Sequence, residues 1–122
     1  MNTKNKVFHL KTCGTCRKII AAIAAEEKCE LQNIKQEHIS PEELDWAAGV
    51  TGSYESLFSR KAIKYRELGL ADQQLSEQDY RRLILSDYSF LKRPVLFIGG
   101  EVFAGNAPKT VEAAAAKLAK LG

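Results

Sequence analysis

Cys13-Gly14-Thr15-Cys16-Arg17-Lys18 stands between a run of β-forming residues and an amphipathic helical run. Residues 6–10, Lys-Val-Phe-His-Leu, predict a short strand that stops at the Thr-Cys-Gly turn. Residues 16 to about 28 predict a helix, because apolar side chains recur at helical spacing at Ile19, Ile20, Ile23 and Ala24. The two cysteines are therefore expected where a strand passes into a helix.

The middle of the chain is predicted to be helical and more polar. Ser40-Pro41-Glu42-Glu43 has the features of a helix start, with Ser as N-cap, Pro at the first position and Glu in the first turn. We expect that helix to run to Ala48 and to stop at Gly49. Shorter helical pieces are expected at 54–58, at 61–67 closed by Gly69, and from Ser76, where Tyr80, Leu83 and Ile84 follow at helical spacing.

The remaining elements predict a single α/β domain over residues 1–122. Strands are expected at 31–35, in the run 93–98 and at 101–103, with Gly99-Gly100 as a hairpin turn, and an Ala-rich helix at 107–121. The order is β-α-β, a helical insert at about 41–88, then β-β-α. The β-α-β unit implies a parallel pair, and the closing hairpin adds antiparallel strands to the same sheet. This order predicts a thioredoxin-like fold with a mixed four-stranded sheet.

Composition and charge exclude several classes of protein. Of the 122 residues, 45% are apolar and 27% are charged, as in ordinary soluble globular proteins. The net charge of +3 comes from 18 basic and 15 acidic residues spread along the chain, which is too mild to indicate direct nucleic-acid binding. Apolar runs are too short to span a membrane, and no signal-peptide core follows Met1, so we expect a cytoplasmic protein.

Cysteine usage points to redox chemistry. The chain has three cysteines, which argues against a disulfide framework in a cytoplasmic protein and favours metal binding or redox activity. Zinc is not expected, since neither His9 nor His38 stands at a finger-like spacing from a second cysteine pair. The Cys-x-x-Cys pair at a strand-to-helix junction predicts a thiol redox site with no metal.

Each position of the motif has an expected role. A cysteine at a helix N-terminus lies among unpartnered N–H groups and at the positive end of the helix dipole, and both favour the thiolate. We expect Cys13 to attack the substrate and Cys16, about one turn inside, to resolve the mixed disulfide. Gly14 leaves room for a tight turn, the Thr15 hydroxyl can hydrogen bond to an anion, and Arg17 adds positive charge.

Arg93-Pro94 precedes a strand-like run. Cis peptides are nearly confined to X-Pro bonds, and a proline is tolerated at the first residue of a strand. We predict a cis bond at Pro94, facing the reactive cysteine and leaving backbone groups free to pair with substrate.

The other chemistry-bearing residues are given structural roles. Cys29, at the end of the first helix, is expected to be a partly buried small hydrophobe, with a third redox thiol as the alternative. His9 is expected to be structural, and His38 is expected at the surface of a loop.

Four ordered segments resemble the ArsC-like family, which includes glutathione- and glutaredoxin-dependent arsenate reductases and the Spx regulators. They are the Cys13–Lys18 motif, Leu57-Phe58-Ser59-Arg60-Lys61, Tyr65-Arg66-Glu67-Leu68-Gly69-Leu70 and Lys92-Arg93-Pro94-Val95-Leu96. The resemblance spans nearly the whole chain.

This resemblance implies a thiol-dependent reductase. Cys13 matches the family's nucleophile, while Arg60 and Arg93 match arginines that bind an oxyanion or tune the thiolate, as the planar guanidinium suits. No bound cofactor is implied, and glutathione or glutaredoxin would donate electrons to reduce a small oxyanion or disulfide.

Two departures from the arsenate reductases bear on the substrate. The stretch 102–108 lacks the third arginine that those enzymes carry after the last strand, and Cys16 stands where they usually have serine. The second departure resembles the Spx regulators, so the alternative function is a redox-sensing transcriptional regulator that binds the RNA polymerase α subunit.

Overall fold

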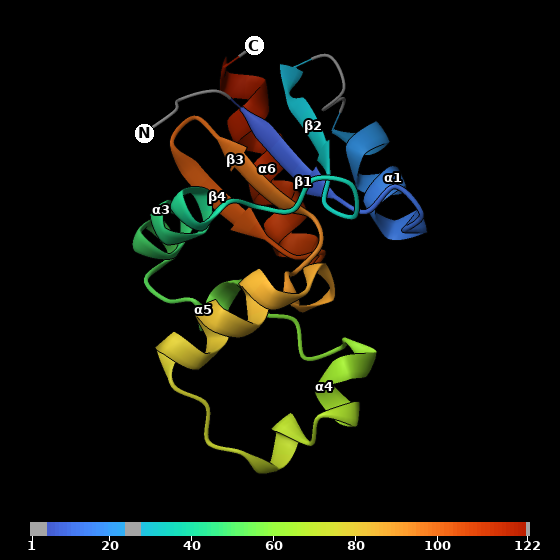
Figure 1. Ribbon diagram of the computed structural model, residues 1–122. Coiled ribbons are helices and arrows are strands. Elements are labelled where there is room, and N and C mark those ends of the chain that lie inside the picture. The colour runs from blue at the N-terminus through green and yellow to red at the C-terminus, as the bar shows by residue number, and fades with distance from the viewer. Residues whose placement is uncertain (1–4, 24–27, 122) are drawn as a thin grey trace. The chain divides into compact units, whose positions relative to one another are not determined.

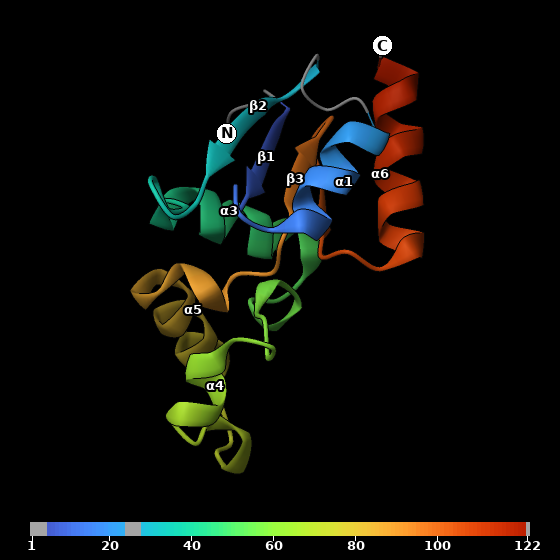
Figure 2. The ribbon, with the colours of Figure 1, turned by 90° about the vertical axis from the view of Figure 1, so that its right-hand side faces the viewer.

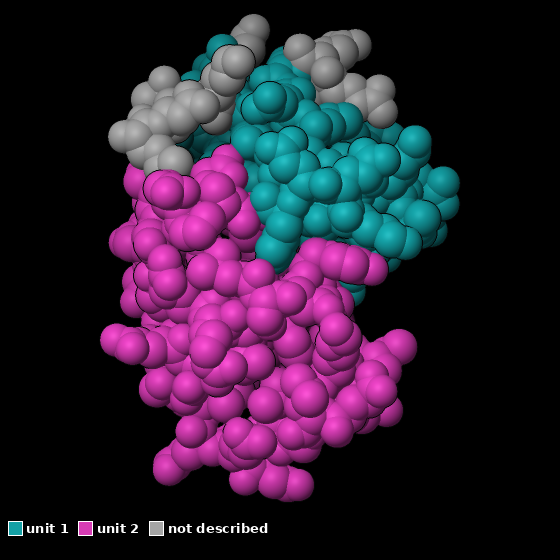
Figure 3. Space-filling view, in the orientation of Figure 1, with its two compact units in different colours: residues 1–38, 93–122 teal, residues 39–92 magenta. Residues whose placement is uncertain are grey.

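The computed structural model describes residues 5–23 and 28–121. These residues form two compact units, one of residues 1–38 and 93–122 and the other of residues 39–92 (Figure 3). The first contains the sheet and is called the sheet unit. The second, the helical unit, contains the insert expected at about 41–88.

The sheet unit is built on four short strands (Figure 1). They are β1 (Lys6–His9), β2 (Glu30–Asn33), β3 (Val95–Ile98) and β4 (Glu101–Ala104), in the order β2-β1-β3-β4. Strand β1 pairs in parallel with β2 and antiparallel with β3, and β3 pairs antiparallel with β4. This mixed four-stranded sheet confirms the predicted thioredoxin-like fold.

Helices α1 (Gly14–Ala22) and α6 (Pro108–Leu121) cover the same face of the sheet (Figure 2). Their buried side chains meet Val7 of β1 in one apolar core with Ile19, Ile20, Ile23, Leu96, Ile98, Ala114 and Leu118. Side chains alternate between the faces of a strand, and Phe8 accordingly packs on Phe97, with ring centroids 4.8 Å apart. Helix α1 begins two residues earlier than predicted and ends at Ala22, and positions 24–27 of the predicted helix lie outside the described residues.

The helical unit begins with α3 (Pro41–Thr51), whose start follows the prediction. The Ser40 hydroxyl accepts from the Glu43 N–H at 3.1 Å, and the Glu43 carboxylate accepts from the Ser40 N–H at 3.0 Å. The predicted end at Gly49 is wrong. The helix runs through Gly49 and ends at Gly52, whose φ of 98° is open to glycine and strained for other residues.

An aromatic cluster fills the rest of the helical unit. Its short elements are η1 (Glu55–Leu57), α4 (Ile63–Glu67), η2 (Leu70–Asp72), α5 (Glu77–Ser86) and η3 (Tyr88–Phe90). The Phe58 ring stacks on Phe90 at 5.4 Å and also contacts Tyr80 at 4.9 Å and Tyr65 at 5.9 Å. Phe58, directly after η1, and Leu91, directly after η3, form an antiparallel bridge before the chain returns to the sheet.

No helix in the part of the chain that the structure describes is both long enough and apolar enough to cross a membrane.

Candidate functional site

Cys13 is the N-cap of α1. Strand β1 ends at His9, and the Cys13 N–H donates to the Leu10 carbonyl at 2.9 Å, closing the turn. The Cys13 carbonyl then accepts the first helical hydrogen bond, from the Arg17 N–H at 3.1 Å. The first turn of α1 contains no acidic residue. The Cys13 sulfur therefore lies at a helix N-terminus whose own first turn contributes no carboxylate.

The surroundings of Cys13 favour its thiolate. Partial burial by itself would raise the pKa of Cys13, but the backbone N–H and the thiol of Cys16, then the Thr15 N–H and the Arg93 charge, together hold it below the usual value. Cys13 is half-buried, so its sulfur keeps contact with solvent. A lowered pKa and an accessible sulfur are the two properties a nucleophilic cysteine needs.

Cys16 has the opposite environment. It is fully buried at 0% exposure, and burial is the main reason that its pKa rises to about 11. A contact with the Leu10 backbone lowers this pKa, whereas the hydrogen bond with Cys13 and the Cys13 charge raise it further. The two cysteines are thus an outer thiolate and an inner thiol, and the Cys16 thiol donates a hydrogen bond to the Cys13 sulfur.

Arg93 and Pro94 lie at the start of β3. The Arg93-Pro94 bond is cis, as predicted. The Pro94 carbonyl accepts from the Gly105 N–H at 2.9 Å, which connects the start of β3 to the end of the hairpin. Arg93 is half-buried, and its charge lowers the pKa of both cysteines, so it belongs to the site.

The other predicted residues of the motif are all exposed. A Cβ built on Gly14 would meet no heavy atom within 4 Å, and Gly14 does not have a positive φ. The space around Gly14 is therefore open, as expected, but a larger side chain would also fit there. Gly14, Thr15 and Arg17 are exposed in the first turn of α1.

Arg60 belongs to the helical unit. Its guanidinium donates to the Glu55 carboxylate at 2.6 Å and to the Tyr80 hydroxyl at 3.0 Å, and it lies 5.7 Å from the centre of the Tyr80 ring. These contacts raise the pKa of Arg60, the Glu55 carboxylate contributing most. Its predicted role at the anion remains a prediction.

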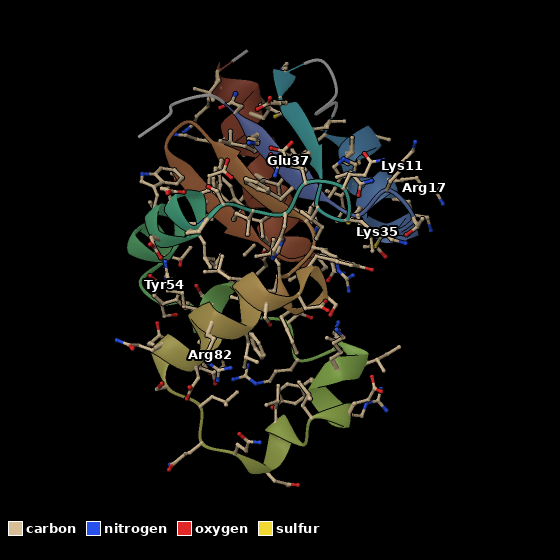
Figure 4. All side chains as sticks on the ribbon, viewed as in Figure 1. Lys11, Arg17, Lys35, Glu37, Tyr54 and Arg82 are labelled. Atoms are coloured by element: carbon tan, nitrogen blue, oxygen red, sulfur yellow. The ribbon has the colours of Figure 1, made fainter. Side chains whose placement is uncertain are left out.

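Sequence reasoning missed a neighbouring loop. The Asn33 carboxamide oxygen accepts from the Lys11 N–H at 3.3 Å and from the Lys35 N–H at 3.4 Å, which joins the loop before Cys13 to the loop after β2. Gln32 fixes the second loop by donating to the Glu37 carbonyl at 2.8 Å. Figure 4 shows Lys11, Arg17 and Lys35 on this side of the unit. The pairing depends on the register of β1 against β2, which no local motif encodes.

The remaining candidate residues are Cys29, His9 and His38. Cys29 is half-buried against the apolar core, and burial raises its pKa, which matches the expected role of a small hydrophobe. Burial lowers the pKa of His9 in β1. His38 lies in the loop after β2, as expected, and is half-buried there. Among the described residues, no group of three or more His, Cys, Asp or Glu is arranged to hold a metal ion.

The chain is similar in sequence and in fold to known proteins of one family. Residues 8–114 match the model of the ArsC family. The chain is 33% identical over 98 residues to the uncharacterized protein YusI of Bacillus subtilis (strain 168), covering 76% of this chain and 82% of that one. An arsenate reductase from Vibrio cholerae superposes with a TM-score of 0.76 at 20% identity, covering 93% of this chain and 99% of the other. SACOL0876 from Staphylococcus aureus COL superposes with a TM-score of 0.70 at 28% identity, covering 90% and 97%.

Proposed function

Because the chain belongs to the ArsC family, we propose that it is a thiol-disulfide oxidoreductase in which Cys13 is the nucleophile and Cys16 resolves the intermediate. The observation that carries the proposal is the pairing of an accessible N-cap cysteine of lowered pKa with a fully buried cysteine one turn inside the same helix. The outer sulfur can attack a substrate, while the inner one is reached only from Cys13.

The proposed reaction has two exchanges. The Cys13 thiolate attacks one sulfur of the substrate disulfide, forms a mixed disulfide and expels the first substrate thiolate, which takes a proton from water. Cys16 then loses its proton to solvent, attacks the Cys13 sulfur and expels the second substrate thiolate. Two electrons pass from the protein dithiol to the substrate, which leaves as two thiols, and a Cys13–Cys16 disulfide remains.

An external thiol must reduce that disulfide for turnover. We assign this role to glutathione, acting directly or through glutaredoxin, so that no bound cofactor is required. Gly14, Thr15 and Pro94 would line the approach of the substrate. Arg93 would stabilise the thiolate, and Arg60 is kept as the second anion-binding candidate.

A disulfide fits the site better than arsenate. The stretch Val102–Pro108, which passes β4 and its exit, has no arginine to add to Arg93. The Arg60 guanidinium is bonded to Glu55, so an oxyanion would have to compete with a carboxylate for it. The buried thiol of Cys16 is a resolving group for a disulfide and has no role in holding an oxyanion.

The test is turnover of a simple disulfide with glutathione and glutaredoxin, beside the same assay with arsenate. We expect wild type to catalyse reduction of the disulfide and Cys13→Ser to add nothing to the uncatalysed rate. With pre-reduced protein and no glutathione, we expect Cys16→Ser to release one thiol per protein. Cys29→Ser is the matched control, and it is expected to retain full activity. Equal activity of wild type and Cys13→Ser would refute the proposal.

A second candidate uses the same cysteine pair as a sensor. A dithiol that closes to a disulfide can also switch a regulator, and Cys16 is the residue shared with the Spx proteins. The discriminating experiment is a pull-down with the C-terminal domain of the RNA polymerase α subunit, with and without oxidant. Binding in one redox state without disulfide turnover would favour the regulator.

A further inference from the structure

Charge is divided unevenly between the two units. Residues 1–38 and 93–122 contain eleven Lys and Arg, six Glu and no Asp, which gives the sheet unit a net charge of +5 with His neutral. Residues 39–92 contain seven Lys and Arg against nine Asp and Glu, a net charge of −2. The mild charge of the whole chain therefore conceals a basic unit, and that unit is the one that contains Cys13.

Within the sheet unit, the paired carboxylates lie at the end of the sheet away from Cys13. Glu30 stands at the start of β2 and pairs with Lys6 at 3.8 Å. Glu101 begins β4, opposite the last residue of β3, and pairs with Lys117 at 2.8 Å. Cys13 follows the other end of β1. These two carboxylates therefore neutralise lysines at the end of the sheet away from Cys13.

At the end of the sheet near Cys13, exposed basic side chains are not neutralised by ion pairs in the part of the chain that the structure describes. Lys11, Arg17 and Lys35 are all exposed, and none forms an ion pair with another residue that the structure describes. The backbone hydrogen bonds to Asn33 hold the loops of Lys11 and Lys35 side by side. We call these three cations the basic rim (Figure 4). One carboxylate, Glu37, lies in the same loop as Lys35, so the rim keeps a positive charge.

Resting on the proposed function, we propose that the basic rim selects disulfides whose scissile sulfur is flanked by carboxylates. A positive field over the entrance raises the local concentration of an anionic substrate and speeds its encounter with the thiolate. A cationic disulfide is repelled by the same side chains. The selected group is an acidic peptide carrying the disulfide, free or as a segment of a folded protein, and the exchange chemistry is that given above.

The test uses three blocked tripeptide disulfides that differ only in the flanking charge: Glu-Cys-Glu, Gln-Cys-Gln and Lys-Cys-Lys. Pre-reduced Cys29→Ser protein is mixed with each, and the rate of the first thiol release is measured in single turnover. Each rate is divided by that of dithiothreitol with the same peptide, which removes differences in intrinsic reactivity. At about 10 mM salt we expect the acidic peptide to react at least about tenfold faster than the basic one, falling to about twofold near 300 mM.

The rim variant is Lys11→Glu combined with Lys35→Glu, and Lys120→Glu is the control for a charge reversal away from the rim. Lys120 is an exposed residue of the last turn of α6, and its reversal changes net charge without touching the rim. We expect the rim variant to lose or invert the acidic preference and Lys120→Glu to keep it. Because the readout is a ratio of substrates, a change in the Cys13 pKa does not affect it.

The outcomes separate this proposal from the one it rests on. Fast reduction of all three peptides at equal normalised rates would overturn charge selection and leave the oxidoreductase in place. No reaction faster than free cysteine would overturn both. The acidic disulfide has two sources, a free peptide and a segment of a folded protein. They are separated by presenting the same Glu-Cys-Glu disulfide within a folded carrier protein. Retention of the acidic preference in the carrier assigns protein segments, and its loss assigns free peptides.

Discussion

Resolution of the mixed disulfide is expected to depend steeply on pH. The pKa of Cys16 is about 11 in the reduced protein, chiefly because the thiol is buried. At pH 8 only about one Cys16 in a thousand is therefore a thiolate, and only the thiolate attacks. Once Cys13 is in a mixed disulfide, its charge and its hydrogen bond no longer raise this pKa, but the burial remains. We expect the pKa of Cys16 to fall and still to exceed that of a free cysteine.

The two exchanges then have different pH profiles. Below the pKa of Cys16, the rate of the second exchange rises about tenfold per pH unit, or about a hundredfold from pH 7 to pH 9. The first exchange depends on Cys13, whose pKa is lowered, so its rate levels off at lower pH. At neutral pH the mixed disulfide should accumulate.

The assay is stopped-flow release of a coloured aryl thiolate from one equivalent of its disulfide. Wild type should show two phases, the second speeding up with pH, while Cys16→Ser should show the first phase alone. A second phase whose rate changes less than about threefold between pH 7 and pH 9 would contradict the assigned roles, since a buried thiol that must lose its proton cannot react at a constant rate.

Three further changes test other parts of the structure. Arg93→Gln removes the cation that lowers the pKa of Cys13, so ultraviolet titration of the thiolate should show that pKa raised, with Arg93→Lys between the two. Phe58→Ala removes a ring that is 1% exposed and contacts three other rings, and urea unfolding should show a loss of about 3–5 kcal/mol, with no loss contradicting the assigned packing. Asp87→Ala removes the cap of η3 and the partner of Lys64, which should cost about 1–2 kcal/mol at neutral pH. Burial by itself would raise the pKa of Asp87, but the interactions with Lys64 and then Ser89 hold that pKa at about 2. The stability that the Asp87 carboxylate contributes is therefore present above the ordinary aspartate range and is lost as the pH falls through 2. An Asp87→Ala deficit that persists unchanged at pH 2 would contradict that account.

The element order was predictable because local signals and the final fold agree. Ser40 and Glu43 form the capping box that their spacing predicts, and short runs of β-forming residues mark β1 and β3. The end of α3 was not predictable, since Gly49 and Gly52 are identical in sequence terms. Only the backbone, which turns to positive φ at Gly52, distinguishes them.

The candidate site, too, was predictable from the sequence only in part. The position of Cys13 at a helix start follows from the motif, because a short strand and an amphipathic helix must meet there. The burial of Cys16 and the effect of the Arg93 charge on the pKa of both thiols depend on which strands lie together, and β3 joins β1 from far along the chain. The link that Asn33 makes between two loops depends on the same register and has no local signature.

The strand order has a consequence for synthesis of the protein on the ribosome. Strand β1 lies in the sheet between β2 and β3, and β3 is made only after all of residues 39–92. Until then, the apolar face of α1 lacks Leu96, Ile98 and α6, which complete its core. The helical unit draws its contacts from a continuous stretch, so it can form first, whereas the sheet unit must close a long loop. During translation, Cys13 and Cys16 therefore leave the ribosome as ordinary cysteines, and the difference in acidity between them arises only when the last thirty or so residues are in place.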